Sequence, residues 1–218
     1  MAKIKKLNWY VQKGYSIEDT LEYHGLGFEG FEIIEKATKN SLKVKKKIIA
    51  DLCKDLRREL LEEYDFNPAA DISKVKNGVY IIALGGPFEL QYEKKPSRVL
   101  YIGSGSVYSR VRKHLSGKLF DFAESIPNMK LRFFFADLGD GKNSHDKCRF
   151  LEQRLLEKFK DETDDSLPLL NKINSRLSKD ETYTLPTGWD KPLHADRGKS
   201  VVEWRLIPSN FDKWKGSL

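Results

Sequence analysis

Three short apolar runs constrain the fold of this chain more than any other feature. They occupy residues 78–84, 98–103 and 130–137, and each carries apolar residues at consecutive positions rather than at alternate ones. A strand with this pattern is buried on both faces. The runs therefore predict an α/β (α+β) fold, in which a small central antiparallel or mixed three-stranded sheet is flanked by helices.

The segments around these runs predict the helices that cover the sheet. Residues 41–64 carry leucines and isoleucines at helical spacing, and an Asn-Pro pair ends the segment. Further helices fit at 106–116 and 145–160. Residues 1–40 look irregular, and a late apolar stretch at 201–207 predicts an added strand.

Composition narrows the class of protein. The 218 residues include 39 Lys and Arg against 32 Asp and Glu, a net charge of +7 that suits a polyanion partner. We find no apolar run long enough to cross a bilayer and no secretory signal. The missing apolar run predicts no membrane partner. Cys53 and Cys148 lie in predicted helices and indicate small core residues in a reducing compartment, which predicts a cytoplasmic protein.

Lysines crowd residues 43–47, near the start of the first long predicted helix. Two interpretations are open. The helix can be a supporting element with a solvated basic face, or its start can contact a DNA backbone. The solvated face is the more ordinary of the two, because lysines usually extend into water.

One carboxylate falls among the apolar positions of the 145–160 helix. At about 100° per residue, Glu152 lies within the arc formed by Cys148, Leu151, Leu155, Leu156 and Phe159. A lone buried carboxylate needs a partner. That partner is either a core-facing arginine or a metal ion, since Mg²⁺ often binds through one or two carboxylates with water and phosphate completing its shell.

Arg110 and His114 are four residues apart, so they share one face of the 106–116 helix. An arginine there can grip a phosphate and neutralise transition-state charge. A histidine can move a proton near neutral pH. The alternative is an exposed basic helix surface without a catalytic role, and this is our interpretation of Arg112 and Lys113.

Tyr80 and Tyr101 lie on neighbouring predicted strands. A strand tyrosine is usually a packing residue whose hydroxyl finds some partner. The ordinary pKa of a tyrosine, near 10, is too high for a good base. Arg110, His114 and a metal ion could lower the pKa if they lie beside these two side chains.

These residues occur in the order of a known motif set. Gly78-Val79-Tyr80, Tyr101-Ile102-Gly103, Arg110, His114, Glu152 and Asn171 resemble the motifs of the GIY-YIG nuclease superfamily. The resemblance covers about residues 76–175. It implies a shallow concave surface for double-stranded DNA and phosphodiester hydrolysis assisted by Mg²⁺ or Mn²⁺, one ion per active site.

The resemblance also implies roles for single residues. Glu152 would bind the metal and Arg110 would hold the scissile phosphate. Tyr80 or Tyr101 would activate or position water, with His114 beside them.

Asn171 would brace the site by hydrogen bonds. The stretch from Tyr101 to Arg110 is one residue shorter than the commonest pattern, which leaves Arg112 as the alternative phosphate ligand; the four-residue step to His114 favours Arg110. Where some restriction-type members carry a lysine, this chain has Ser104.

The sequence therefore predicts a metal-dependent DNA endonuclease, of the type II restriction kind because no separate DNA-binding module is evident. A homodimer on DNA is compatible with this prediction. The alternatives are a mobile-element or repair nuclease of the same superfamily, and a non-catalytic nucleic-acid-binding module that kept the fold. The predicted division is an N-terminal helical extension (1–75), a GIY-YIG-like catalytic core (76–175) and a C-terminal extension packed on the core (176–218).

Overall fold

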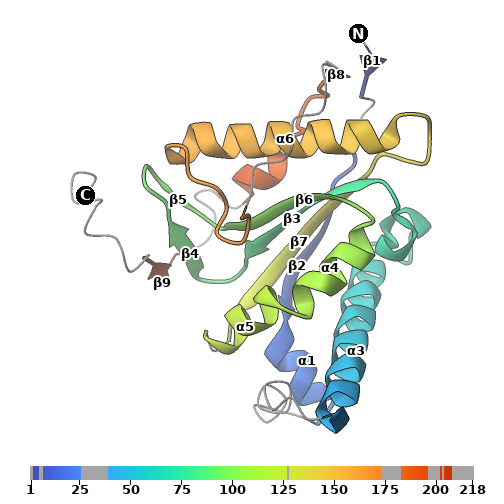
Figure 1. Cartoon of the computed structure of the whole chain (residues 1–218), viewed down its shortest axis with the longest axis vertical. Coiled ribbons are helices and arrows are strands. Elements are labelled where there is room, and N and C mark those ends of the chain that lie inside the picture. The colour runs from blue at the N-terminus through green and yellow to red at the C-terminus, as the bar shows by residue number, and fades with distance from the viewer. Residues whose placement is uncertain are drawn as a thin grey trace.

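A four-stranded sheet forms the centre of the computed structural model (Figure 1), with strand order β2-β7-β3-β6. All of its neighbouring strands are antiparallel. The structure describes residues 2–4, 7–25, 39–126, 128–172, 183–195, 202 and 204–207. The four strands are β2 (Tyr10–Ser16), β3 (Gly78–Leu84), β6 (Val99–Gly105) and β7 (Lys130–Asp137).

Helices cover both faces of this sheet. The long α6 (Ser144–Thr163) crosses one side, and α3 (Lys39–Glu63) and α4 (Val107–Leu115) lie on the other (Figure 1). Strand β3 is buried along its whole length, which explains why apolar residues follow one another in its sequence. The predicted antiparallel sheet flanked by helices is confirmed.

The predicted number of strands is wrong by one. Strand β2 pairs with β7 and makes a fourth strand, although its residues look irregular in the sequence. Its register shifts between Gln12 and Tyr15, and such an irregularity breaks the alternation that identifies a strand. The strand lies within residues 1–75, which were assigned to a helical extension; the domain division itself stays a prediction.

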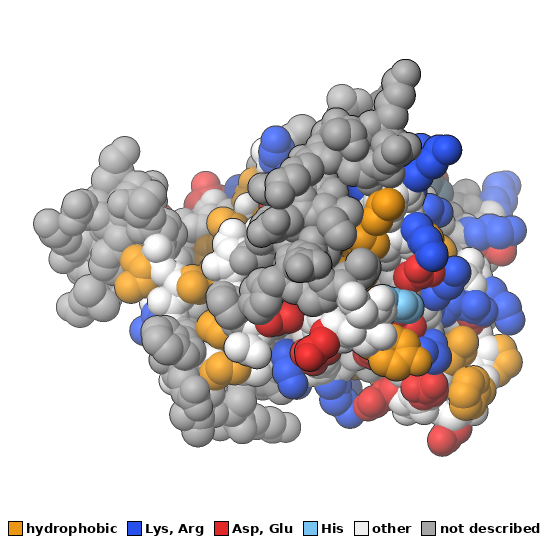
Figure 2. All heavy atoms as spheres, turned by 90° about the horizontal axis from the view of Figure 1, so that it is seen from below, with side chains coloured by type: hydrophobic (Ala, Val, Ile, Leu, Met, Phe, Trp, Pro, Cys, Tyr) orange, Lys and Arg blue, Asp and Glu red, His pale blue; other side chains and the backbone are white. Residues whose placement is uncertain are grey.

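Helix α3 carries much of the basic charge on its side of the molecule. Figure 2, a view from below Figure 1, shows lysine and arginine side chains gathered on the side where α3 lies. The apolar stripe of the same helix faces inward. Its members Ile48, Ile49, Leu52, Leu56 and Leu60 are all buried.

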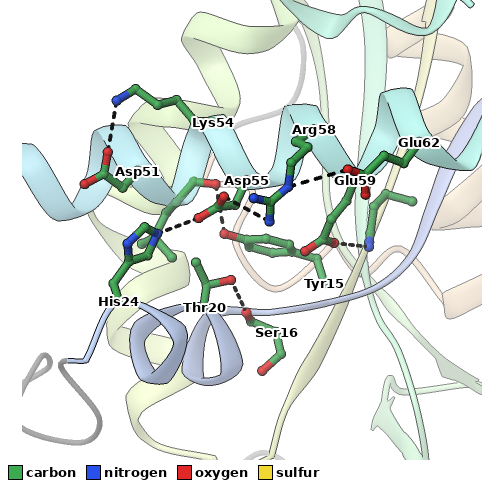
Figure 3. Close-up of polar contacts among 12 residues, drawn as sticks. Tyr15, Ser16, Thr20, His24, Asp51, Lys54, Asp55, Arg58, Glu59 and Glu62 are labelled. Carbon is green, nitrogen blue, oxygen red and sulfur yellow. Dashed lines mark hydrogen bonds and ion pairs between the residues drawn. The ribbon is translucent and has the colours of Figure 1, made fainter. Parts of the chain in front are cut away.

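The short helix α1 (Ile17–Tyr23) begins at a side-chain cap. Ser16 Oγ accepts a hydrogen bond from the backbone N–H of Asp19 at 3.0 Å. Ser16 also accepts through its carbonyl from Thr20 Oγ1 at 2.9 Å (Figure 3). The first of these two hydrogen bonds satisfies the backbone N–H of Asp19 at the start of the helix.

A polar network joins α1 and β2 to α3 (Figure 3). Tyr15 Oη donates to the carbonyl of Leu52 at 2.9 Å. The nearly buried carboxylate of Asp55 lies 2.7 Å from His24 Nε2 and 3.1 Å from Arg58 Nη2. These contacts hold the edge strand and the first helix against the long helix.

The remaining elements are short. Strand β9 (Trp204–Leu206) falls inside the stretch predicted as an added strand, and it pairs in parallel with β4 (Phe88–Gln91). These elements are β1 (Ala2–Lys3), η1 (Pro68–Ala70), η2 (Ile72–Lys74), β4 (Phe88–Gln91), β5 (Pro96–Ser97), α5 (Lys118–Glu124), β8 (Tyr183–Thr184), η3 (Lys191–His194) and β9 (Trp204–Leu206).

Two further predictions concern the cysteines and the membrane. Cys53 and Cys148 are free and buried, as predicted for core residues. Burial raises the pKa of the Cys53 thiol to about 11 and that of Cys148 to about 12. Among the helices described, none has the length and apolar character needed to cross a membrane.

Candidate active site

The candidate site straddles β6, the strand at one edge of the central sheet. Tyr80 on β3 pairs across the sheet with Gly103 on β6, so the two residues share a face. A Cβ at Gly103 would lie 2.6 Å from Tyr101 Cε1 and 2.7 Å from Tyr80 Oη. A glycine is therefore needed here, because any side chain would displace the two phenol rings.

Three rings form one cluster between the sheet and α4. The Tyr80 and Tyr101 rings stack with centroids 5.8 Å apart, and the His114 ring lies 4.1 Å from that of Tyr101. Tyr80 Oη is 3.0 Å from His114 Nε2. Tyr80 is buried, whereas Tyr101 is only half-buried. Tyr101 is therefore the more accessible of the two side chains.

Burial controls the pKa values of both tyrosines. It is the largest cause raising the pKa of Tyr80, and it also raises that of Tyr101, where the negative charge of Glu152 acts in the same direction. The positive charge of Arg110 opposes both shifts without overcoming them. Arg110 thus acts in the expected direction, but burial outweighs it, and the lowering expected from a metal ion stays a prediction.

His114 is also pushed away from its charged form. Burial is the largest cause that lowers its pKa to about 4, and the charges of Arg110, Lys118 and Lys113 add to it. The ring is therefore neutral at pH 7. Its observed contact is the hydrogen bond with Tyr80, and a role in moving a proton or orienting water stays a prediction.

Glu152 approaches the same edge of the sheet from the other face. It lies on α6 among the buried side chains predicted to surround it, and it is itself half-buried. Ser104 Oγ donates to Glu152 Oε2 at 2.5 Å. Burial raises the pKa of Glu152, whereas the Ser104 hydrogen bond and the charges of Arg110 and Arg149 lower it.

The partner of Glu152 decides between the two interpretations of a buried carboxylate. In the part of the chain that the structure describes, no lysine or arginine forms an ion pair with Glu152, and its hydrogen-bond partner is a serine. The arginine alternative is therefore not what the structure shows. Among the described residues, this half-buried carboxylate has no cationic side chain in contact with it.

This donor set fits a hard divalent cation. No cluster of three or more His, Cys, Asp or Glu side chains gathers as a preformed cage among the described residues. An ion at Glu152 would thus be held by one carboxylate together with water and substrate phosphate, which is a common arrangement for Mg²⁺. The raised pKa agrees with this, because a cation would stabilise the ionised form that burial disfavours.

The structure separates the two candidate arginines. The Nε of Arg110 would lie 3.7 Å from a Cβ at Gly105, directly after Ser104 on β6. The charge of Arg110 acts on the pKa values of the site residues named above, whereas that of Arg112 acts on Cys53 and Tyr108. Arg110 belongs to the site, and Arg112 faces α3.

Asn171 holds the edge strand. Its Oδ1 accepts from the N–H of Ile102 at 3.0 Å, and its Nδ2 donates to the carbonyl of Ile102 at 2.9 Å. The N–H of Leu170 also donates to the carbonyl of Leu100 at 2.9 Å. The segment satisfies backbone groups that an edge strand leaves unpaired, so Asn171 is a positioning residue.

Sequence reasoning missed two residues. Ser104 alternates with the tyrosine and glycine of its strand and so points to the α6 face; this alternation could have indicated contact with Glu152. Lys118 gave no signal, because it lies on a seven-residue helix that the pattern did not predict. Its Nζ donates to the carbonyl of Leu170 at 2.8 Å, and its charge acts on His114.

Comparison of the chain with protein-family models, with curated proteins and with solved structures gives no match.

Proposed function

We propose that this protein is a metal-dependent DNA endonuclease that hydrolyses phosphodiester bonds. The observation that carries the proposal is that the charges of Arg110 and Glu152 both act on Tyr101, around the edge strand β6. A phosphoryl transition state needs positive charge on its oxygens, a cation at the leaving oxygen and an oriented water. In this proposal Arg110 supplies the positive charge, Glu152 holds the cation and Tyr101 orients the water.

Each residue has a distinct role in this proposal. Arg110 binds the non-bridging oxygens of the scissile phosphate with its planar donors. Tyr101 orients the attacking water through its hydroxyl. The hydrogen bond between Tyr80 and His114 fixes the rings against which Tyr101 stacks, and Asn171 fixes the backbone of β6. A divalent cation, when bound at Glu152, supplies Lewis-acid stabilisation of the leaving oxygen.

The reaction is an in-line displacement. Water attacks phosphorus and releases a proton to the solvent, the bond to the 3′ oxygen breaks, and that oxygen takes up a proton from the solvent, so the products are a 5′-phosphate and a 3′-hydroxyl. Both tyrosines retain their protons, and neutral His114 has a depressed pKa of about 4. No member of this aromatic cluster is therefore a good base at neutral pH. We expect cleavage to depend fully on added metal.

The finer proposal is a restriction-type enzyme acting on double-stranded DNA. It is supported by the integration of β2 into the central sheet, which makes the N-terminal region part of one compact body. A mobile-element or repair nuclease is the alternative. Digestion of a complex DNA mixture followed by sequencing of the ends separates them: discrete shared ends support restriction, and scattered ends contradict it.

The weak basicity of the aromatic cluster also favours a second candidate, a nucleic-acid-binding module without catalysis. The test is incubation of supercoiled plasmid with the protein in Mg²⁺, in Mn²⁺ and in EDTA. Nicking or linearisation with either metal, and none in EDTA, supports the nuclease. Binding without cleavage over a broad substrate panel supports the module.

A further inference from the structure

A second basic surface lies outside the candidate active site, in the groove between α3 and α4. The groove has a volume of about 440 Å³. Four of its lining side chains are cationic and two carry hydroxyl groups, and no acidic side chain lines it. The lining residues are Leu42, Lys45, Lys46, Ile49, Ser109, Arg112, Lys113 and Ser116.

The groove and the site are opposite faces of one helix. His114 contacts Tyr80 of the sheet and exposed Arg110 lies beside Gly105 of β6, whereas Ser109, Arg112 and Lys113 line the groove on the α3 side. A helix with its side chains is about 10 Å across, and successive phosphates of a B-DNA strand are spaced about 3.4 Å along the axis. On these dimensions, a duplex with one phosphate on Arg110 would carry other phosphates of its backbone about one helix diameter away, which is the scale that separates Arg110 from the groove.

The sequence at the start of α3 is unfavourable for helix stability, and the packing of the helix does not explain it. Residues 39–50 contain five lysines and no acid, and the first turn of the helix has no acidic residue. Lysines near the positive end of a helix dipole are unfavourable, and so is the like-charge pair Lys43 and Lys47, four residues apart. Such departures from local stability are typical of functional surfaces.

These lysines are available for a partner. In the described part of the chain, Lys45 and Lys46 have no acidic side chain in ion-pair contact. By contrast, Lys54, Arg57 and Arg58 further along the same helix all pair with aspartates. Among the described residues, the lysines of α3 without an ion pair thus lie in its N-terminal half, and Lys45 and Lys46 are the two that line the groove.

We propose that the α3–α4 groove binds the phosphate backbone of the DNA duplex beside the scissile phosphate. The proposal rests on the proposed nuclease function, because it places the groove and the site on the same duplex. It assigns α3 a binding role in addition to its packing role. Backbone contacts of this kind position a duplex and carry no base specificity.

The test compares two variants that lose the same charge. The groove variant is Lys45→Gln/Lys46→Gln/Arg112→Gln. The control variant is Lys94→Gln/Lys130→Gln/Lys191→Gln, which changes three exposed lysines outside the groove. Binding of a fluorescent duplex is measured in EDTA over roughly 50 to 200 mM salt, a range in which affinity that comes from phosphate contacts falls steeply with salt.

The groove variant should bind at least tenfold more weakly than the control at the upper end of that range. Its plot of log affinity against log salt should be shallower by about two to three, at about 0.9 per lost phosphate contact. A charge-preserving variant, Lys45→Arg/Lys46→Arg/Arg112→Lys, should bind like wild type, which excludes misfolding as the cause. Equal affinities and slopes for the groove and control variants would overturn the proposal.

Cleavage is measured separately, so the two proposals can fail independently. Wild-type protein that binds through the groove yet never cuts DNA would refute the nuclease and leave the groove standing. Wild-type protein that cuts in Mg²⁺ while the groove and control variants bind alike would refute the groove and leave the nuclease standing.

Discussion

The hydroxyl oxygen of Tyr80 lies 3.0 Å from Nε2 of His114, and neither group is ionised at neutral pH. Their hydrogen bond joins the central strand β3 to helix α4. The ring of Tyr101 stacks on Tyr80 and contacts His114. This pair of buried Tyr80 and half-buried His114 is thus a brace, and Tyr101 is the more accessible of the two tyrosines.

The two tyrosines should respond differently to loss of the hydroxyl. Tyr101→Phe should lower the cleavage rate by about 10²-fold or more with little change in stability. Tyr80→Phe leaves the buried side of His114 without its partner and should lower the free energy of unfolding by about 1 kcal/mol. Single-turnover cleavage and urea denaturation measure the two effects. Wild-type cleavage by Tyr101→Phe would remove its assignment to water.

The two arginines of α4 should also separate. Arg110→Ala should slow cleavage by about 10²- to 10³-fold, the usual effect of removing a transition-state donor. Arg112→Ala should weaken DNA binding and reduce the salt slope by about one, with a much smaller effect on the rate at saturating DNA. The reverse order of rates would show that Arg112 holds the scissile phosphate.

His114 should make the fold less stable in mild acid. Its folded pKa of about 4 lies below the ordinary value of 6.5, so the unfolded chain takes up a proton that the folded protein does not. Its contribution is present above pH 6.5 and is lost as the pH falls toward 4. Between pH 6.5 and pH 4, the free energy of unfolding from urea denaturation should fall by roughly 2 kcal/mol more in wild type than in His114→Gln. Parallel curves would contradict the lowered pKa.

Glu152 should show the opposite sign. Its folded pKa is raised above the ordinary 4.5, so its contribution to stability is present below that value and is lost as the pH rises through the folded pKa. Glu152→Gln should therefore stabilise the metal-free protein at pH 7 and raise its Tm, because glutamine carries no charge that burial disfavours. Calorimetry in EDTA measures this, and the gain should disappear at pH 4.

Much of the core could be predicted because burial on both faces leaves a plain pattern. The strands at 78–84 and 130–137 coincide with β3 and β7, and α6 buries the predicted arc around Glu152. Strand β2 could not be found in the same way. Its irregular register between Gln12 and Tyr15 and its polar residues hide the alternation.

Long-range pairings were beyond the sequence for a different reason. Strand β9 pairs with β4 more than a hundred residues earlier, in a stretch that the pattern leaves as a connection. The candidate site residues were predicted from helix spacing and from the resemblance of the motifs, but their ionisation could not be. Spacing shows which groups meet, whereas the pKa values of Tyr80 and His114 are set mainly by burial, which only the packed structure reveals.

The most direct test of the central claim is cleavage of supercoiled plasmid in Mg²⁺ by wild type and by Glu152→Gln, with DNA binding of both measured in EDTA. The account predicts that wild type cuts, that the variant cuts at least 10³-fold more slowly, and that both bind DNA with equal affinity. Cleavage by Glu152→Gln at a rate near that of wild type would contradict it.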